Sequence, residues 1–268
     1  MAVHPVSFFS GALFARMSCF VYLPPSYEQS ERAYPVIYLL HGMYGCESSW
    51  LTKGGAEQTI ERMIASSELR ESIVVMPSDG GYGHGTFYID WYDGTGNYEQ
   101  YMMYDLVPYI DANYRTMADK SFRCIGGLSM GGFGAFMLAM RHPQTFGAAV
   151  SLSGALGSVG QLPYTEFTRS GWARMTGPQQ GDHAKKYDLA LLSQARASEK
   201  ERPALYFDCG KDDSLFPLNT AFKRHLEETG YAHEFAEFEG THNWEYWTLH
   251  LADGLLFFER EMSGKEGT

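Results

Sequence analysis

The sequence FRCIGGLSMGGFGAFMLAMRHP (residues 122–143) decides the fold, because an apolar run meets a helix-forming run at a cluster of glycines. Residues 122–129 predict a buried strand, and residues 131–143 predict a helix that the final proline ends. Between them, GLSMG (127–131) fits the G-x-S-x-G pattern, in which a serine occupies a sharp turn from strand to helix.

Ser129 is therefore a candidate nucleophile. The small residues around it permit a bend at which larger side chains would collide, and the bend raises the hydroxyl above the sheet. The bend also puts the backbone N–H of Met130 at a helix N-terminus, where a developing oxyanion is stabilised. The alternative is a glycine-rich turn that only packs a helix on a strand, and the strand and helix flanking Ser129 favour the catalytic interpretation.

A serine hydroxyl needs a base and an acid to become a nucleophile. In folds with this strand–serine–helix turn, the acid and the base both follow the serine along the chain, after later strands. The strand-like run 204–210 (ALYFDCG) is followed by Asp212 and Asp213. Only one of these adjacent side chains can face a histidine, and we favour Asp213 as the acid. Asp208 lies inside the predicted strand and is a weaker candidate.

The base is assigned in the same way. The strand-like run 233–239 (HEFAEFE) is followed by Gly240, Thr241 and His242. His242 is therefore the predicted base, and His84, in a glycine-rich loop, is its rival. His233 begins a predicted strand, and His142, His225 and His250 fall on predicted helices, where packing and surface roles are expected.

A second oxyanion donor is expected at the end of the apolar run 34–40, which leads into His41, Gly42 and Met43. In hydrolases of this architecture the loop after that strand supplies a backbone N–H. Met43 and Met130 are therefore the predicted oxyanion donors. We interpret His41 as a structural residue that anchors the loop.

The wider pattern alternates strands with helices, which predicts an α/β fold with a mostly parallel sheet and helices on both faces. The predicted strands are 15–23, 34–40, 72–77, 122–129, 148–154, 204–210 and 233–239, and the predicted helices are 57–68, 97–115, 131–143, 218–229 and a last one from about Trp244. Two stretches interrupt the alternation. We predict a long loop over residues 79–97 and a cap over the sheet at about residues 155–203. The whole chain, residues 1–268, is predicted to be a single domain.

Charge and composition exclude several function classes. The chain has 268 residues, and 21 Lys and Arg against 32 Asp and Glu give a net charge of −11. Phosphate backbones and anionic lipids repel such a protein, so we expect no nucleic-acid partner and no membrane partner. The N-terminal residues do not form a signal peptide, which predicts a cytoplasmic protein; a secreted protein with its leader removed stays open as the alternative.

No metal and no cofactor are expected. Asp79, Asp90 and Asp93 lie among glycines but lack the spacing and the final glutamate of an EF-hand. The four cysteines are scattered without a CxxC pair. A small-molecule or carbohydrate ester is the expected partner, and the sequence leaves a homo-oligomer open.

Taken together, these motifs resemble the esterase D-like family, also known as carbohydrate esterase family one. The resemblance rests on HGMYG (41–45) with Trp50, the glycine-rich elbow at 127–134, GKDD (210–213) and HNWEYW (242–247), and it spans about Val6 to Met262. It implies an α/β-hydrolase fold, a Ser129–His242–Asp213 triad and an oxyanion hole at Met43 and Met130. These assignments agree with those made from the residues.

The resemblance implies a serine carboxylic-ester hydrolase that forms an acyl-enzyme. S-formylglutathione hydrolases of this family carry Ser-Gly-Leu-Thr-Cys where this chain has HGMYGC (41–46), which favours short-chain acyl or carbohydrate-linked esters, as in the feruloyl and acetylxylan esterases. Three alternatives stay open: a thioesterase of the S-formylglutathione type, an acyltransferase on the same triad, and a non-catalytic binding domain.

Aromatic residues are the candidates for binding the substrate, because aromatic rings stack on both sugars and acyl groups. We expect Tyr44, Tyr88 and Trp244 to line the site. The aromatics of the 79–97 loop, among them Tyr82 and Phe87, either line the site or pack the loop onto the neighbouring helix.

Overall fold

The protein is described from a computed structural model, in which residues 2–81, 85–157, 169–178 and 180–264 are placed. Within these residues eight strands form one sheet in the order β1-β2-β4-β3-β5-β6-β7-β8. The strands are β1 (Val3–Ser10), β2 (Ala15–Tyr22), β3 (Val36–Leu40), β4 (Ile73–Pro77), β5 (Arg123–Leu128), β6 (Ala148–Leu152), β7 (Ala204–Gly210) and β8 (His233–Phe238). The strands from β4 to β8 pair in parallel, and β1 and β2 extend the sheet antiparallel, so the predicted mostly parallel sheet is confirmed.

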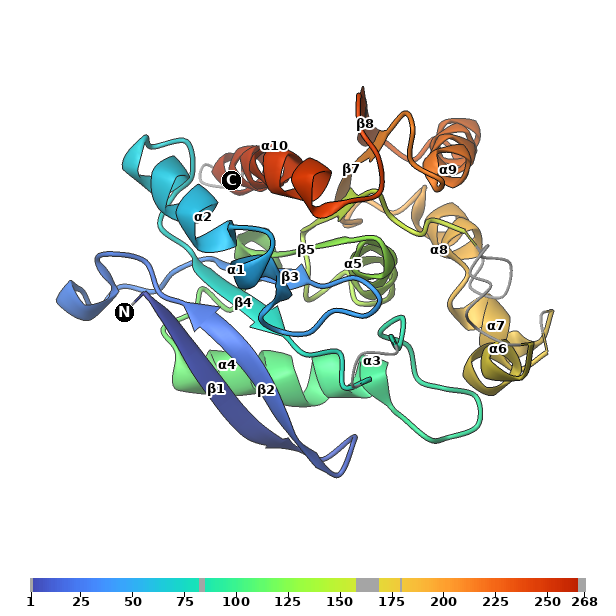
Figure 1. The fold of residues 1–268 in the computed structure, drawn as a ribbon, viewed down its shortest axis with the longest axis horizontal. Helices are drawn as coiled ribbons and strands as arrows, with labels where there is room; N and C mark the ends of the chain where they lie inside the picture. The colour runs from blue at the N-terminus through green and yellow to red at the C-terminus, as the bar shows by residue number, and fades with distance from the viewer. Residues whose placement is uncertain (1, 82–84, 158–168, 179, 265–268) are drawn as a thin grey trace.

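Helices cover both faces of the sheet (Figure 1). They are α1 (Ser49–Thr52), α2 (Ala56–Ala65), α3 (Tyr98–Gln100), α4 (Val107–Asn113), α5 (Met130–Arg141), α6 (Arg169–Thr176), α7 (Asp182–Lys186), α8 (Leu189–Arg196), α9 (Phe216–Thr229) and α10 (Trp244–Ser263), with the short segments η1 (Tyr27–Gln29), η2 (Tyr101–Leu106, π-helical) and η3 (Lys120–Phe122). The helices α2 and α10 share one apolar core with the sheet, and α4, α5 and α9 share the other. The chain therefore has the helices on both faces of the sheet that the alternation predicts, in the α/β-hydrolase fold that the family resemblance implies.

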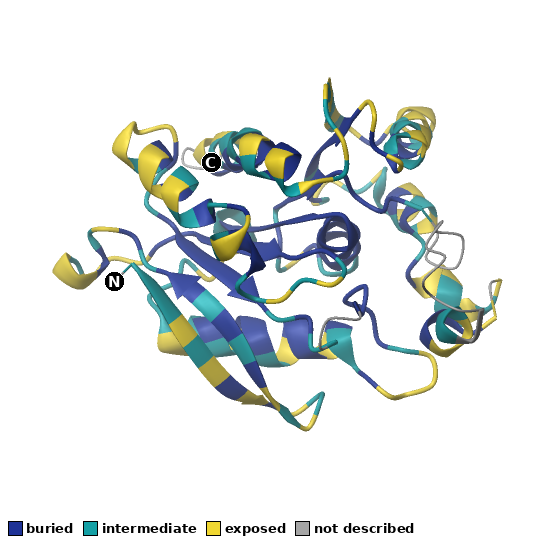
Figure 2. Ribbon diagram, viewed as in Figure 1, coloured by how far each residue is buried: buried dark blue, intermediate teal, exposed yellow. Residues whose placement is uncertain are grey.

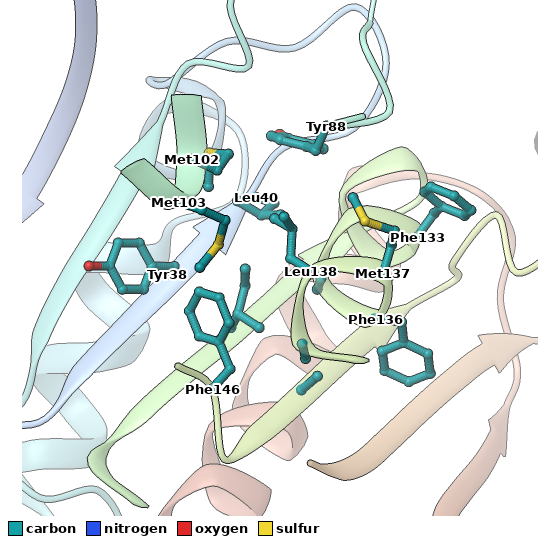
Figure 3. Packing of buried hydrophobic residues seen from close by; sticks show 14 of the residues in the cluster. Tyr38, Leu40, Tyr88, Met102, Met103, Phe133, Phe136, Met137, Leu138 and Phe146 are labelled. Atoms are coloured by element: carbon teal, nitrogen blue, oxygen red, sulfur yellow. The ribbon is translucent and has the colours of Figure 1, made fainter. Parts of the chain in front are cut away.

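The central strands are buried along their whole length, as Figure 2 shows. This burial explains their continuous apolar runs, since neither face of a parallel sheet covered by helices meets water. On the α5 side the rings of Tyr38 and Phe146 meet edge to face, with centroids 5.9 Å apart, beside Leu138 (Figure 3). The packed core fixes the position of α5, and with it the position of the turn that precedes α5.

The sequence pattern missed β1. Its residues VHPVSFFS contain a proline, which argues against a central strand. The structure places β1 at the edge of the sheet, paired only with β2. An edge strand can accommodate Pro5, because one row of its backbone groups has no partner strand.

The segment 155–203 contains α6, α7 and α8 within its described residues. The helix α8 packs between α5 and α9, so this part belongs to the layer that covers the sheet. Asp188 begins α8, and its carboxylate accepts hydrogen bonds from the N–H groups of Ala190 and Leu191. Residues 158–168 lie outside the described residues, and the prediction of a cap over the remainder of the segment stays a prediction.

A buried carboxylate ties three helices together. Glu99 of α3 contacts Arg141 at the end of α5 at 2.6 Å and His142 at 2.8 Å. It also lies 3.5 Å from Lys186 of α7 and accepts a 3.0 Å hydrogen bond from the hydroxyl of Tyr187. Burial alone would raise the pKa of Glu99, but the hydrogen bonds and cations around it lower the pKa to about 2.

We expect Glu99→Gln to lower the free energy of unfolding near neutral pH by about 3 kcal/mol, because Arg141 loses its partly buried carboxylate. The pKa of Glu99 falls from 4.5 to about 2 on folding, so its stabilisation is present above pH 4.5 and is lost as the pH falls toward 2. Chemical unfolding of both proteins over this pH range measures the effect. A difference in stability that does not shrink on acidification would contradict this assignment.

Candidate active site

Ser129 occupies a one-residue turn between β5 and α5. Its backbone has φ 54° and ψ −118°, a conformation that costs free energy for a residue with a side chain. The glycines on either side allow the turn. A Cβ on Gly127 would lie 2.5 Å from the carbonyl carbon of Gly131, and a Cβ on Gly131 would lie 2.5 Å from the carbonyl oxygen of Leu40.

Backbone hydrogen bonds hold this turn against the neighbouring strand. The N–H of Ser129 donates to the carbonyl of Leu152 at the end of β6, at 3.0 Å. The carbonyl of Ser129 accepts from the N–H of Ala155, also at 3.0 Å. The strained conformation is therefore fixed from two sides, which keeps the hydroxyl in one position.

The structure brings Ser129, His242 and Asp213 together in one line of contacts. The Nε2 atom of His242 lies 2.9 Å from the Oγ of Ser129, and its Nδ1 lies 2.8 Å from the Oδ2 of Asp213. The side chain of Asp213 is fully buried, and its Oδ1 accepts a 2.8 Å hydrogen bond from the N–H of Leu215. Asp212 is exposed, as expected for the member of the pair that does not face the histidine.

Two glycines let the loops that carry the acid and the base approach each other. Gly210 ends β7 and Gly240 follows β8, and a Cβ on Gly210 would lie 2.3 Å from the carbonyl oxygen of Gly240. Gly240 has φ 137°, which favours glycine. The N–H of Asp212 donates to the carbonyl of Gly240 at 3.1 Å. The two strands thereby deliver Asp213 and His242 to adjacent positions.

The rival base and rival acid do not take part in this line of contacts. His84 lies outside the described residues. Asp208 is buried inside β7, where its Oδ1 accepts a 2.9 Å hydrogen bond from the hydroxyl of Tyr246, and burial raises its pKa to about 8. Five further histidines bond to backbone or to other carboxylates: His142, His183, His225, His233 and His250.

The loop after β3 lies directly beside the turn. A Cβ on Gly42 would lie 2.6 Å from Leu128 and 3.3 Å from the Cβ of Ser129, so only glycine allows this approach. Met43 follows Gly42 in the loop, and Met130 is the first residue of α5, where the N–H has no acceptor within the helix. Both predicted oxyanion donors thus belong to segments that border Ser129.

His41 anchors this loop, as its sequence position suggests. The side chain is buried, and its Nδ1 lies 2.8 Å from the carbonyl oxygen of Gly42. Its Nε2 accepts a 3.2 Å hydrogen bond from the N–H of Asp79, and the Asp79 carboxylate in turn accepts from the N–H and hydroxyl of Thr86. The imidazole therefore joins the loop after β3 to the loop after β4.

A cavity of about 410 Å³ opens next to Ser129 and His242. Residues 42–45 and Leu128 form one part of its wall, and Asn243, Trp244, Trp247 and Lys53 form the other part. Tyr44 and Trp244 line this cavity, in the places that the sequence suggested. The indole of Trp247 stands edge to face against His242, with ring centroids 4.9 Å apart.

Tyr88 does not line the cavity, and the prediction that it contacts the substrate is wrong for this structure. Its side chain is fully buried, and its hydroxyl donates a 3.0 Å hydrogen bond to the carbonyl of His41. The ring lies against α5 at Gly134, where a Cβ would come within 2.5 Å of it. Phe87 is buried as well, so these two aromatics pack the loop, whereas Tyr82 lies outside the described residues.

Two cavity residues had no clear signal in the sequence. Trp247 follows Trp244 by three positions, a helical spacing that indicated packing of the last helix alone. Lys53 lies just after α1, within a segment that carries no motif. Only the fold shows that both reach the same cavity.

In the parts of the chain that the structure describes, no group of three or more His, Cys, Asp or Glu side chains could hold a metal ion. The helices in the same ranges include none that is both long and apolar enough to cross a membrane.

The sequence of this chain is similar to those of known esterases. The family model described as "Putative esterase" matches residues 10–258. An endo-1,4-beta-xylanase/feruloyl esterase from Xylanibacter ruminicola is 34% identical over 161 residues, which cover 57% of this chain and 21% of that protein. An acetyl esterase from Caldicellulosiruptor saccharolyticus is 25% identical over 233 residues, covering 84% of this chain and 83% of that protein.

Among solved structures, a ferulic acid esterase superposes with a TM-score of 0.81 and 30% identity, and the match covers 97% of this chain and 98% of that chain. The chain thus spans about a fifth of the xylanase/feruloyl esterase but nearly the whole of the ferulic acid esterase structure.

The close approach at the turn gives a test that needs no substrate. We expect Gly131→Ala to lower the free energy of unfolding by about 2 kcal/mol or more, because the new methyl group would overlap the backbone of Leu40. Gly11→Ala is the matched control, since a Cβ there meets only one atom, at an ordinary 3.7 Å. Thermal or chemical unfolding of the two variants compares them, and equal stabilities would contradict the packing described for the turn.

Proposed function

The chain belongs to the family described as Putative esterase, and from this premise we propose that it is a serine carboxylic-ester hydrolase with Ser129 as nucleophile, His242 as base and Asp213 as acid. One observation carries the proposal. The Ser129 hydroxyl lies 2.9 Å from the His242 imidazole, and the imidazole lies 2.8 Å from the Asp213 carboxylate, next to an open cavity. This arrangement is the one that activates a serine for attack.

In the acylation step the Oγ of Ser129 attacks the ester carbonyl carbon while Nε2 of His242 takes the hydroxyl proton. The buried carboxylate of Asp213 holds the Nδ1–H of the ring and stabilises the imidazolium that forms. The imidazolium then gives its proton to the leaving alcohol as the C–O bond breaks. The products of this step are the free alcohol and an ester between the acyl group and Ser129.

The negative charge on the carbonyl oxygen needs hydrogen-bond donors at the turn. The N–H of Met130 points from the N-terminus of α5, where the helix dipole adds positive potential. The N–H of Met43 lies on the loop that Gly42 brings against Ser129. Each such donor lowers the barrier by about 3 kcal/mol.

Deacylation repeats the chemistry with water. His242 takes a proton from a water molecule that attacks the acyl carbonyl, and it then returns the proton to Ser129 as the acyl bond breaks. The cavity wall is open to solvent at Tyr44, whose side chain is 56% exposed, so water can reach the ester.

Short-chain acyl esters and carbohydrate-linked esters are the proposed substrates, with acetyl and feruloyl groups as the acyl part. The proposal is supported by the names of the similar proteins, a feruloyl esterase, an acetyl esterase and a ferulic acid esterase. It is also supported by the indoles of Trp244 and Trp247 on the cavity wall, because an aromatic acyl group or a sugar ring packs against such surfaces.

We further propose that the part of segment 155–203 before α8 acts as the cap of this single domain. Arg174 of α6 forms a 2.7 Å ion pair with Asp93, and the N–H of Tyr92 donates to the carbonyl of Met175. These contacts fasten α6 to the loop after β4. The same loop reaches the site at Gly85, where a Cβ would lie 2.8 Å from the sulfur of Met130.

We expect Ser129→Ala to lower kcat for 4-nitrophenyl acetate by about 10⁶-fold, since the triad acts as a unit. Ser66→Ala, on the surface at the end of α2, is the control and should keep wild-type turnover. Initial rates with purified protein measure both variants. Near-normal hydrolysis by Ser129→Ala would refute the proposed function.

We expect Asp213→Asn to lower kcat by about 10⁴-fold, because the amide no longer holds the histidine in the required tautomer. Asp212→Asn is a matched control one residue away, with an exposed side chain that does not face His242. If the two substitutions reduce turnover equally, the acid has been assigned to the wrong residue.

A further inference from the structure

A tryptophan wall borders the cavity on the α10 side: Trp244 and Trp247 line the cavity, and the buried Trp50 packs against Trp244 behind them. The rings of Trp50 and Trp244 meet edge to face with centroids 5.6 Å apart, and those of Trp244 and Trp247 do so at 5.3 Å. Trp50 donates a 3.0 Å hydrogen bond from its Nε1 to the carbonyl of Leu40. Contacts therefore link the end of β3 to the ring of His242 through the three indoles.

Lys53 stands at the end of this wall. Its N–H donates to the carbonyl of Ser49 at 3.0 Å, which closes the single turn of α1. The next residue, Gly54, packs between two of the indoles, and a Cβ there would lie 2.9 Å from both Trp244 and Trp50. The backbone of Lys53 is thus held against the tryptophan wall, and Lys53, which is exposed to solvent, is one of the residues that line the cavity.

The charge at this position is unusual for the cavity. The described residues that line the cavity include three ionisable side chains, Tyr44, Lys53 and His242, and no Asp or Glu. Lys53 is the one that carries a positive charge at neutral pH without depending on a nearby carboxylate. Within the described residues the ammonium of Lys53 makes no ion pair and no hydrogen bond. The chain as a whole carries a net charge of −11, so a cation without a carboxylate partner at the cavity has the opposite sign to the net charge of the protein.

We propose that Lys53 forms an anion subsite, and that the preferred ester carries a carboxylate or a similar anionic oxygen group beyond an apolar or aromatic spacer. The proposal rests on the proposed function and deepens it. The reacting carbonyl binds at Ser129, the spacer packs against Leu128 and Trp244, and the anionic group reaches the ammonium of Lys53. A charge-assisted hydrogen bond of this kind strengthens binding and selects against neutral analogues.

The local cation can dominate although the protein is acidic. Salt screens the interaction between exposed charges over about 8 Å at physiological ionic strength, so distant carboxylates act weakly on a ligand in the cavity. Lys53 is exposed to solvent, and it can act on a ligand anion only at contact distance, where the Coulomb attraction exceeds that of distant charges. The subsite should therefore discriminate by charge, and this preference should weaken as salt is added.

The experiment compares matched pairs of esters that differ only in charge. One pair, 4-acetoxybenzoate and its methyl ester, carries the charge on the leaving alcohol. The other pair, the 4-nitrophenyl monoester of adipic acid and its methyl ester, carries the charge on the acyl group. The measured quantity is the ratio of kcat/KM for the anionic ester to that for the neutral ester.

We expect Lys53→Met to lower this ratio about tenfold in one of the two pairs, mainly through KM, because it keeps the aliphatic stem and removes the charge. The pair that responds identifies the side of the ester that the subsite binds. Lys53→Arg should keep the ratio, and Lys53→Glu should lower it further. Lys223→Met on α9 removes an equal charge from a residue paired with Glu227 and should leave the ratio unchanged.

An unchanged ratio in Lys53→Met for both pairs would overturn the subsite. An equal fall in Lys223→Met would also overturn it, because the effect would then come from the overall charge of the protein. Calorimetric binding to Ser129→Ala of 4-acetamidobenzoate and of the monoanilide of adipic acid, each compared with its methyl ester, tests the subsite without turnover. Tighter binding of either anion that Lys53→Met abolishes supports the subsite even if ester hydrolysis fails, and equal binding within both pairs contradicts it.

Discussion

The structure depends on a steric constraint at one residue. β5 must reverse into α5 within the single position of Ser129, and the backbone can do so only because Gly127 and Gly131 leave no side chain at the point of closest approach. The same closeness puts α5 against the end of β3, so the loop that carries Met43 lies beside the hydroxyl. The positions of the proposed nucleophile and of the proposed oxyanion donors are thus consequences of one packing arrangement.

The parallel sheet supplies the remaining parts of the site. Because the carboxyl ends of parallel strands lie along one edge, residues 113 positions apart come into hydrogen-bond contact there, as Ser129 and His242 do. Asp213 follows β7, the strand next to β8, and its carboxylate accepts a hydrogen bond from the backbone N–H of Leu215. Glu99 of α3 forms ion pairs with Arg141 of α5 and Lys186 of α7. These contacts hold the three helices together through residues outside the site.

Much of this arrangement could be predicted from the sequence, because it depends on local patterns. Continuous apolar runs marked the buried strands, and the glycines around Ser129 marked the turn. The position of Asp213 and His242 after later strands followed from the rule that such residues lie at one sheet edge. The edge strand β1 escaped detection because Pro5 is tolerated only where a strand lacks a second neighbour, a fact of topology.

The residues that line the cavity could be predicted only in part from the sequence. Tyr88 belongs to the core because Gly134 leaves room for its ring on α5, and no pattern within the loop reveals that space. Lys53, just after α1, and Trp247 of α10 line the same cavity although they are almost two hundred residues apart in the sequence. Contacts of this kind depend on how side chains pack after the fold is complete, whereas the triad depends on where strands end.

Labelling with a fluorophosphonate probe, followed by mass mapping of the adduct, tests whether Ser129 is an activated nucleophile. We expect one adduct, on the peptide that contains Ser129, and a severe loss of labelling when His242 is replaced by alanine. An adduct on a different residue, or equal labelling without His242, would contradict the assignment of this hydroxyl as an activated nucleophile.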